Sequence, residues 1–352
     1  MERNLMKGNE ALAEAAIRAG CKCFFGYPIT PQTELAAYMS KRIFKAGGVF
    51  VQAESEIGAI NMLLGASASG VRAMTSSSSP GISLKSEGIS YIAGSDLPAV
   101  IVNIQRGGPG LGGIQPSQAD YWQATKALGH GDFHLLVYAP SSVQEMVDMV
   151  TTAFDNADKY RIPAMILADG LLGQMMEPVS FPEVAPTEYD KSSWATNGHK
   201  NGRFRNHITS LYLQAPDLER KVKERFERYA AIKANETDAE LYKTEDCDIL
   251  VCSYGATARI VRSAVKMARE QGLRVGAFRP KTLWPFPEKE LNEACKTASK
   301  LLCVEMSMGQ MVDDIKLAIN CSKPVEFFGR TGGVIPTPAE ILEEIKKLGG
   351  AN

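Results

Sequence analysis

Four short stretches of the sequence bring side chains capable of chemistry next to glycine or proline. They lie at residues 26–31 (G-Y-P-I-T-P), 55–59 (S-E-I-G-A), 78–81 (S-S-P-G) and 105–109 (Q-R-G-G-P). The carboxylate of Glu56 could take part in proton transfer if it is shielded from water. The guanidinium of Arg106 could hold a carboxylate through two hydrogen bonds. Together these groups suit a site that binds a small acid.

Each stretch follows or joins an apolar segment, so the elements that position it can be predicted. The expected strands lie at residues 22–27, 49–53, 71–74, 97–104, 134–138 and 163–168. The expected helices lie at residues 8–20, 31–45, 57–69, 82–93 and 141–158, with another that begins at Ser117. This alternation predicts an α/β fold with a doubly wound, mostly parallel sheet. Ligands bind such sheets at the carboxyl ends of the strands.

Local signals set two of the expected boundaries. Pro31 follows Thr30 directly, which predicts a helix with Pro31 at its first position and Thr30 at its N-cap. The serine-rich residues 75–81 come after a strand, and we expect them to form a loop of the site.

The composition and pattern of the sequence change near residues 177 and 247, which predicts three regions. Residues 1–176 form the first α/β domain. Residues 177–246 are an interdomain excursion with a charged helix, on which an apolar stripe runs along Leu218, Val222, Phe226 and Tyr229. Residues 247–352 form a second, smaller α/β domain, with strands expected at 248–254, 273–279, 300–305 and 325–328.

Composition argues against several classes of function. The chain has 352 residues, 39 basic and 40 acidic, and its net charge of -1 gives no field that would attract nucleic acid or an anionic membrane. The sequence suggests no signal peptide and no membrane span, so we expect a cytoplasmic protein. The seven cysteines form no C-x-x-C pair and the chain has only four histidines, so we expect no metal site in this chain.

The four stretches, taken in order, resemble the alpha subunits of 2-oxoacid:ferredoxin oxidoreductases, the thiamine diphosphate enzymes of anaerobic metabolism. The resemblance is strong over roughly the first 175 residues and general over residues 246–346. Within the family it is closest to the 3-methyl-2-oxobutanoate (2-ketoisovalerate) type. The resemblance implies a pyrimidine-type thiamine diphosphate domain at residues 1–176 and a domain like the C-terminal domain of transketolase at residues 247–352.

The resemblance also implies a catalytic role for Glu56. In this family a glutamate hydrogen-bonds the aminopyrimidine ring of the cofactor and favours the tautomer that removes the thiazolium proton. The alternative is that Glu54 and Glu56 are acids that only favour a helix N-terminus.

By the same resemblance, Thr30 and Arg106 contact the substrate. The alternatives are a simple helix cap for Thr30 and an ion pair with a partner chain for Arg106. The implied cofactor-binding residues are Tyr27, Pro28, Ile29, Glu56, Ser79 and Pro80. For the two residues of the serine stretch the alternative is loop structure alone.

Leu111 carries the expectation about the substrate. In 2-oxoglutarate-type relatives the tract tends to read R-T-G-P-S-T-G, with threonine where this chain has Leu111. A leucine offers no polar group to a second carboxylate, so the expected substrate is the branched 3-methyl-2-oxobutanoate. The alternatives are that Leu111 packs in its loop without touching substrate, and that the protein is a 2-oxoglutarate enzyme.

The resemblance implies an incomplete catalytic subunit. The sequence has no G-D-G stretch followed by an asparagine that would bind magnesium and the diphosphate, and no cluster ligands. Thiamine diphosphate would be shared with a beta subunit that carries the magnesium site. Iron–sulfur clusters would lie on a ferredoxin-like subunit, often with a gamma subunit for coenzyme A.

The assembled enzyme would convert a 2-oxoacid and coenzyme A to acyl-CoA and CO2 and reduce ferredoxin. Two alternatives belong to other classes. One is a noncatalytic scaffold subunit. The other is a nucleotide-binding protein that acts alone, because residues 108–113 formally match G-x-G-x-x-G.

Overall fold

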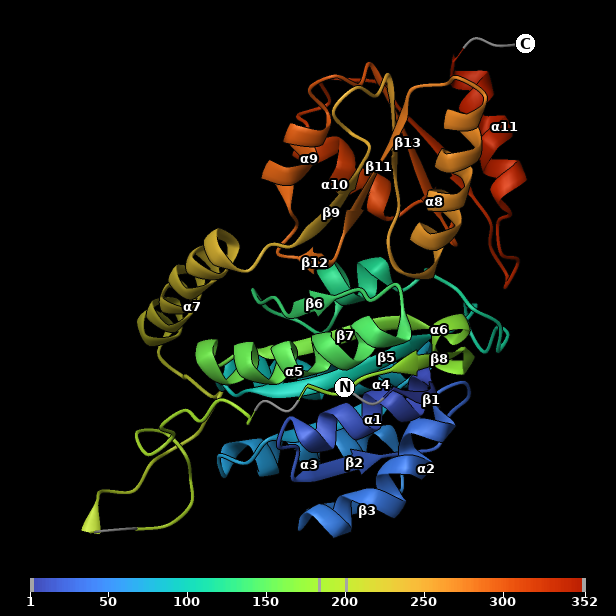
Figure 1. The fold of residues 1–352 in the computed structure, drawn as a ribbon. Coiled ribbons are helices and arrows are strands. Elements are labelled where there is room, and N and C mark those ends of the chain that lie inside the picture. Colours follow the sequence, from blue (N-terminus) through green and yellow to red (C-terminus); the bar gives the residue numbers. More distant parts are fainter. Residues whose placement is uncertain (1–2, 183–184, 200–201, 350–352) are drawn as a thin grey trace.

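The computed structural model describes residues 3–182, 185–199 and 202–349, and it contains two stacked α/β units (Figure 1). The elements of the first unit are β1 Asn4–Lys7, α1 Gly8–Arg18, β2 Cys23–Gly26, α2 Thr33–Arg42, the 3-10 helix η1 Ile43–Ala46, β3 Val49–Gln52, α3 Glu56–Ala68, β4 Ala73–Ser77, α4 Ser79–Gly94, β5 Ala99–Gln105, the π-helix η2 Gln123–Ala127, β6 Leu136–Tyr138, α5 Val143–Tyr160, β7 Pro163–Asp169, α6 Gly170–Gln174 and β8 Met176–Val179.

The elements that follow β8 are α7 Ala215–Asn235, β9 Ala239–Tyr242, β10 Ile249–Cys252, α8 Gly255–Glu270, β11 Val275–Pro280, β12 Thr282–Trp284, α9 Glu288–Ala294, β13 Lys300–Glu305, α10 Met311–Ala318, β14 Val325–Gly329 and α11 Pro338–Gly349. Most of them form the second unit, which is orange and red in Figure 1.

The main sheet of the first unit has the strand order β12-β6-β7-β5-β4-β2-β3 in the described residues, and its strands are parallel except for β12. The central strands β5 and β7 are buried along their whole length, as expected for a parallel sheet covered on both faces. Helix α1 packs against α2 and α5, while α3 packs against α4. The predicted doubly wound, mostly parallel sheet is therefore confirmed.

The predicted start of the second helix is wrong. Helix α2 begins at Thr33 with Gln32 at its N-cap, so Thr30 is not the cap and Pro31 is not the first helical residue. The reason is a contact between distant parts of the chain. The side chain of Gln32 is fully buried, donates to the Tyr27 carbonyl at 3.1 Å and accepts from the Ser76 hydroxyl at 2.6 Å.

The serine stretch is not the predicted loop. Residues 75–77 extend β4, Ser78 is the N-cap residue, and α4 begins at Ser79 with Pro80 in its first turn. Proline suits this position because the first helical amides have no partner within the helix. The stretch therefore passes directly from strand to helix, which fixes its side chains more firmly than a loop would.

No helix begins at Ser117, which is a third difference from the sequence-based expectation. In the described residues the chain stays irregular after β5 until the short π-helix η2. Strands β1 and β8 were not predicted either, and they pair antiparallel in a small separate sheet.

The sheet of the second unit has the strand order β14-β13-β10-β11-β9 within the described residues. Pairing between the units crosses the predicted division at residues 246 and 247. Strand β9 precedes this division but pairs with β11, and β12 follows it but pairs with β6 of the first sheet. The division into three regions therefore stays a prediction. The two α/β units are connected because each sheet contains a strand from the other side of the predicted division.

The apolar stripe predicted on the charged helix is only partly correct. On α7, Tyr229 is buried and Val222 is half-buried, but Leu218 and Phe226 are exposed. Arg225 is buried instead, because its guanidinium donates to the Asp96 carboxylate at 3.1 Å and to the Gly94 carbonyl at 3.0 Å. This ion pair sets the rotation of the helix against the first unit. Across the described helices, none combines the length and the apolar character needed to cross a membrane.

Candidate functional site

The four stretches singled out in the sequence meet at one edge of the main sheet. Strands β5, β4, β2 and β3 are successive neighbours, and three of the stretches follow the carboxyl ends of β5, β4 and β2. The fourth begins α3 shortly after β3 ends. Because the strands are parallel, these ends lie at the same edge, which is the usual ligand-binding edge of such sheets.

The three predicted substrate-binding residues, Thr30, Arg106 and Leu111, meet at the side chain of Arg106. Its side chain is 7% exposed. Nη1 donates to the main-chain carbonyl of Thr30 at 2.8 Å, and Nη2 makes a long contact of 3.5 Å with the carbonyl of Leu111. The Nε atom is buried and has no hydrogen-bond partner among the described residues. The guanidinium therefore keeps a donor for a further acceptor.

The hydrogen bonds from Arg106 to Thr30 and Leu111 are made to main-chain carbonyl groups. The side chain of Thr30 is exposed, and that of Leu111 is 85% exposed at the glycine-rich loop. The structure thus brings the predicted substrate-binding residues together, and their role in binding stays a prediction.

A buried polar network that the sequence did not predict holds the main chain of Arg106. The Ser79 hydroxyl donates to the Asp120 carboxylate at 2.6 Å and accepts from the main-chain amide of Arg106 at 3.0 Å. Asn103 also donates to Asp120, at 2.9 Å. Burial raises the pKa of the Asp120 carboxyl above its usual range, although its hydrogen bonds from Ser79 and Asn103 and the charge of Arg106 oppose this. Ser79 therefore links the start of α4 to the end of β5.

Glu56 occupies a sheltered place against the first turn of α4. It is 6% exposed, at the first position of α3, where the Ser55 hydroxyl caps the helix by accepting from Gly58 at 3.1 Å. A Cβ atom built on Gly81 would stand 2.9 Å from the Glu56 Oε1 atom, so this carboxylate lies directly over a glycine. No described residue donates a hydrogen bond to it, and the nearby hydroxyls of Ser77 and Ser78 are buried without a described partner.

The remaining predicted cofactor residues lie at the same edge. Tyr27 and Pro28 are exposed, and Ile29 and Pro80 are half-buried. They surround the Glu56 and Arg106 loops without any hydrogen bond that would fix a role for them.

The second unit holds the loop that carries Arg106 and Leu111. The Gln118 side chain donates to the Tyr254 carbonyl at 2.8 Å and accepts from the main-chain amide of Met306 at 2.9 Å. The Tyr121 hydroxyl donates to Asp314 at 2.6 Å. Neither Gln118 nor Asp120 carried a signal in the sequence, because both stand in an irregular segment whose partners come from distant strands.

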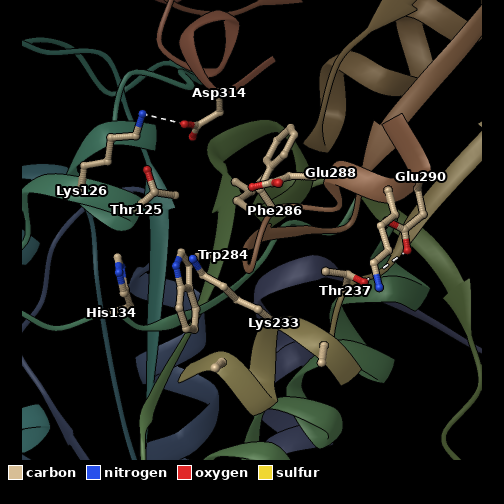
Figure 2. A pocket seen from close by; sticks show the side chains of 14 residues that line it. Thr125, Lys126, His134, Lys233, Thr237, Trp284, Phe286, Glu288, Glu290 and Asp314 are labelled. Atoms are coloured by element: carbon tan, nitrogen blue, oxygen red, sulfur yellow. Dashed lines mark hydrogen bonds and ion pairs between the residues drawn. The ribbon is translucent and has the colours of Figure 1, made fainter. Parts of the chain in front are cut away.

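A separate cavity of about 600 Å3 lies away from this edge, between α7, β12 and α9. Figure 2 shows Lys126 paired with Asp314 on one side and Glu290 in contact with Thr237 on another. His134 stacks on Trp284 with ring centroids 4.6 Å apart, and burial, assisted by Lys233, lowers its pKa to about 4. None of the predicted site residues lines this cavity, so it is not the candidate site.

The structure gives no support to the dinucleotide fingerprint. After residues 108–113 the chain returns to bridge Arg106 with Pro116 and does not enter a helix, as that fingerprint requires. Among the described residues no group of three or more His, Cys, Asp or Glu side chains could hold a metal ion.

Comparison with known protein families identifies the family of this chain. Residues 14–241 match the family model described as "Pyruvate flavodoxin/ferredoxin oxidoreductase, thiamine diP-bdg", and residues 247–341 match "Pyruvate:ferredoxin oxidoreductase core domain II". The chain belongs to the 2-oxoacid:ferredoxin oxidoreductase family. The resemblance expected from the four stretches is thereby confirmed.

Within this family the chain is similar to curated subunits of two kinds. It is 47% identical over 350 residues to the ketoisovalerate oxidoreductase subunit VorB of Methanothermobacter marburgensis, and the match covers 99% of each chain. It is 40% identical over 375 residues to the 2-oxoglutarate synthase subunit KorA of Methanothermobacter thermautotrophicus, again over 99% of each chain. Both are single subunits of multi-subunit oxidoreductases.

Two solved structures extend the comparison. The 2-oxoglutarate:ferredoxin oxidoreductase from Magnetococcus marinus, with 2-oxoglutarate, coenzyme A and succinyl-CoA bound, matches with a TM-score of 0.88 and 28% identity, over 98% of this chain and 65% of the longer one. A split-gene transketolase in an inactive beta4 tetramer matches with a TM-score of 0.60 and 13% identity, over 98% of both chains. The second match shows a shared fold only, and it agrees with the transketolase-like architecture expected from the sequence.

Proposed function

We propose that this chain is the thiamine diphosphate-binding subunit of a 2-oxoacid:ferredoxin oxidoreductase that acts on 3-methyl-2-oxobutanoate. One observation carries the proposal. A buried carboxylate, Glu56, and a buried guanidinium, Arg106, lie at the same edge of the main sheet, after β3 and β5, and the Nε atom of Arg106 has no described hydrogen-bond partner. The carboxylate could bind a basic ring, and a guanidinium with an unused donor could bind the carboxylate of an acidic substrate.

The residues at this edge fit the cofactor that the family uses. The hydroxyls of Ser77 and Ser78 are buried without described partners. Buried polar groups are normally hydrogen-bonded, so these two hydroxyls could bond to a ligand or to a partner chain. Thiamine diphosphate, when bound, supplies a carbon nucleophile that adds to the keto group of a 2-oxoacid.

The chain's own residues would then act in distinct ways. The Glu56 carboxyl group would share a proton with a ring nitrogen of the bound cofactor through a hydrogen bond, in a place sheltered by α4 where that bond is strong. Arg106 binds the substrate carboxylate with the donor it has left, and its bond to the Thr30 carbonyl keeps the guanidinium in a fixed orientation. The buried network of Ser79, Asn103 and Asp120 holds the main chain of Arg106 in place.

The rest of the machinery is assigned to partner subunits. A beta subunit supplies the magnesium ion and the diphosphate contacts, a ferredoxin-like subunit supplies the iron–sulfur clusters, and a gamma subunit helps to bind coenzyme A. The balanced reaction takes one 2-oxoacid anion, coenzyme A and two oxidised ferredoxins to acyl-CoA, CO2, two reduced ferredoxins and one proton. The similarity to subunits of multi-subunit enzymes supports this division of labour.

A second candidate substrate is 2-oxoglutarate, which the similarity to the KorA subunit favours. Leu111 argues against it, because an exposed leucine beside Arg106 offers no polar group to a second carboxylate. The higher identity to a ketoisovalerate oxidoreductase subunit supports the same choice.

The test is anaerobic purification of the native complex, followed by coenzyme A-dependent reduction of a viologen dye. The substrates compared are 3-methyl-2-oxobutanoate, 2-oxoglutarate and pyruvate. We expect the highest kcat/KM with the branched acid. A preference for 2-oxoglutarate would keep the reaction class and overturn the substrate. No activity with any of the three, from a complex that retains thiamine diphosphate and clusters, would overturn the proposed function.

A further inference from the structure

A lysine is completely buried behind the proposed site. Lys85 lies on α4 and is 0% exposed. Its Nζ atom donates to the Thr75 hydroxyl at 2.7 Å and to the Ser76 carbonyl at 3.0 Å. Thr75 commits its own proton to the Phe25 carbonyl at 2.6 Å, so Lys85 must be the donor in the first contact. Both acceptors are neutral, and a buried ammonium ion needs more compensation than neutral acceptors give.

The helix that carries Lys85 presents one face to α3. Gly81, Lys85 and Gly88 are four and three residues apart, which places them on the same side of α4. A Cβ atom on Gly81 would stand 2.9 Å from Glu56 Oε1, and one on Gly88 would stand 2.5 Å from Ile60 Cγ2. Glu56 and Ile60 are in turn four residues apart on α3. Lys85 therefore sits between the two points where the helices meet, and one of these points is the Glu56 carboxylate.

The electrostatics of this place join the two groups. Burial lowers the pKa of Lys85 to about 7, and the negative charge of Glu56 opposes this shift. The two groups that accept hydrogen bonds from the Lys85 Nζ atom, both on β4, are uncharged. Glu56 is therefore the charged group that favours the ammonium form of Lys85, and the two side chains do not form a direct hydrogen bond.

We propose that Lys85 is a positioning residue that acts through Glu56, because its ammonium group, anchored to β4 one helical turn from Gly81, orients the Glu56 carboxylate against Gly81. This inference rests on the proposed function, since Glu56 is the residue through which Lys85 acts. The Lys85 side chain holds a positive charge in a space that water does not reach.

The test compares four forms of the complex: wild type, Lys85→Met, Glu56→Gln and the double variant. Methionine keeps an unbranched apolar side chain and removes the charge. The readouts are kcat/KM and, in the absence of substrate, the rate at which the C2 proton of bound thiamine diphosphate exchanges with deuterium. The second readout reports directly on the group that Glu56 serves and does not depend on turnover. Lys347→Met, at an exposed ion pair with Glu344 on α11 of the second unit, is the control.

We expect Lys85→Met to slow C2 exchange and lower kcat by about 10-fold with little change in KM, which corresponds to about one pKa unit of altered interaction. We expect Glu56→Gln to cost about 100-fold or more, and the double variant to lose no more than Glu56→Gln alone, because residues that act as one unit are not additive. An exchange rate in Lys85→Met equal to that of wild type would overturn the inference. A double variant that loses the product of the two single losses would also overturn it.

A second variant guards against a folding defect. If Lys85→Met lowers the yield of complex, Thr75→Val keeps the charge and the shape but removes one anchor of Nζ, and we expect a several-fold slower C2 exchange. Wild-type exchange in this variant would contradict the inference. The failure of the proposed function looks different, because then the wild-type complex itself would bind no thiamine diphosphate or turn over no 2-oxoacid.

Discussion

Arg106 donates a hydrogen bond from Nη1 to the main-chain carbonyl of Thr30 over 2.8 Å. The contact joins the loop after β5 to the loop after β2, across the intervening strand β4. It uses one corner of a planar guanidinium and leaves the buried Nε without a described partner. The orientation of the proposed substrate-binding group is therefore fixed by the protein before any ligand arrives.

Arg106→Lys should impair substrate binding although it keeps the charge. Lysine cannot satisfy the Thr30 carbonyl and hold a carboxylate in the same planar arrangement. We expect KM for 3-methyl-2-oxobutanoate to rise and kcat/KM to fall by roughly 10- to 100-fold, the value of about 1.5–3 kcal/mol for a charge-assisted hydrogen bond. Steady-state kinetics of the complex measure this. Arg259→Lys, at an exposed ion pair with Glu177, is the control, and equal losses in both variants would contradict the role of Arg106.

Gly81→Ala should displace the Glu56 carboxylate. The added Cβ would overlap the Ser77 hydroxyl and stand 2.9 Å from Glu56 Oε1, closer than ordinary contacts allow. We expect a loss of kcat of about 10-fold or more, since misplacement of a catalytic group by even 1 Å is costly.

The matched control is Gly65→Ala on α3, where an added Cβ meets nothing within 4 Å. It should keep full activity and stabilise the helix by about 0.5–1 kcal/mol. The comparison is informative because both changes add one methyl group. Full activity in Gly81→Ala would mean that Glu56 does not need its present position.

Leu111→Thr should change the choice of substrate. The side chain is exposed next to the guanidinium of Arg106, so a hydroxyl there could meet a second carboxylate. We expect the ratio of kcat/KM for 2-oxoglutarate to that for 3-methyl-2-oxobutanoate to rise by about 10-fold, the value of one hydrogen bond. Ile114→Thr, in the same loop, should leave the ratio unchanged. An unchanged ratio in Leu111→Thr would show that this leucine does not select the substrate.

Lys85 should make the stability of the complex depend on pH. Its pKa of about 7 in the folded chain lies below its ordinary value of 10.5, so between these pH values the unfolded chain binds more protons and stability rises with pH. Below about pH 7 the destabilising effect is fully present, because the ammonium is then buried with its charge. Lys85→Met removes this effect.

The thermal midpoint of Lys85→Met minus that of wild type should therefore be higher at pH 6 than at pH 9, by roughly a few degrees. The loss of the two hydrogen bonds of Nζ lowers the midpoint of the variant equally at both pH values, so it does not affect the comparison. A difference that stays constant with pH would contradict the assignment of the titrating group to Lys85.

Much of the fold could be predicted because the strands of the main sheet are apolar and are separated by glycine, proline and helix-like segments. The errors came where distant contacts outweigh local signals. Thr30 looked like an N-cap, but the buried amide of Gln32 bonds to Tyr27 and Ser76 and moves the start of α2. Strand β12 belongs to the predicted second domain but joins the first sheet, and no local sequence pattern indicates that pairing.

The candidate site was predictable to a similar extent. Glu56 and Arg106 stood in recognisable stretches, and the structure places both at one sheet edge. Asp120 and Gln118 could not be found, since their partners come from Ser79, Asn103 and the second unit. Lys85 did carry a signal that could have been used, because it is a single charge on the small-residue face of a helix between Gly81 and Gly88.

The most direct test of the account is Glu56→Gln beside Glu54→Gln in the purified complex, with thiamine diphosphate content and 3-methyl-2-oxobutanoate oxidation measured on the same samples. Glu54 is exposed, two residues away, and subject to the same helix N-terminus, so it controls for the loss of a nearby charge. The account predicts that Glu56→Gln assembles normally and loses about 100-fold or more in kcat, while Glu54→Gln keeps its activity. Wild-type activity in an assembled Glu56→Gln complex would contradict the catalytic role and favour a scaffold subunit.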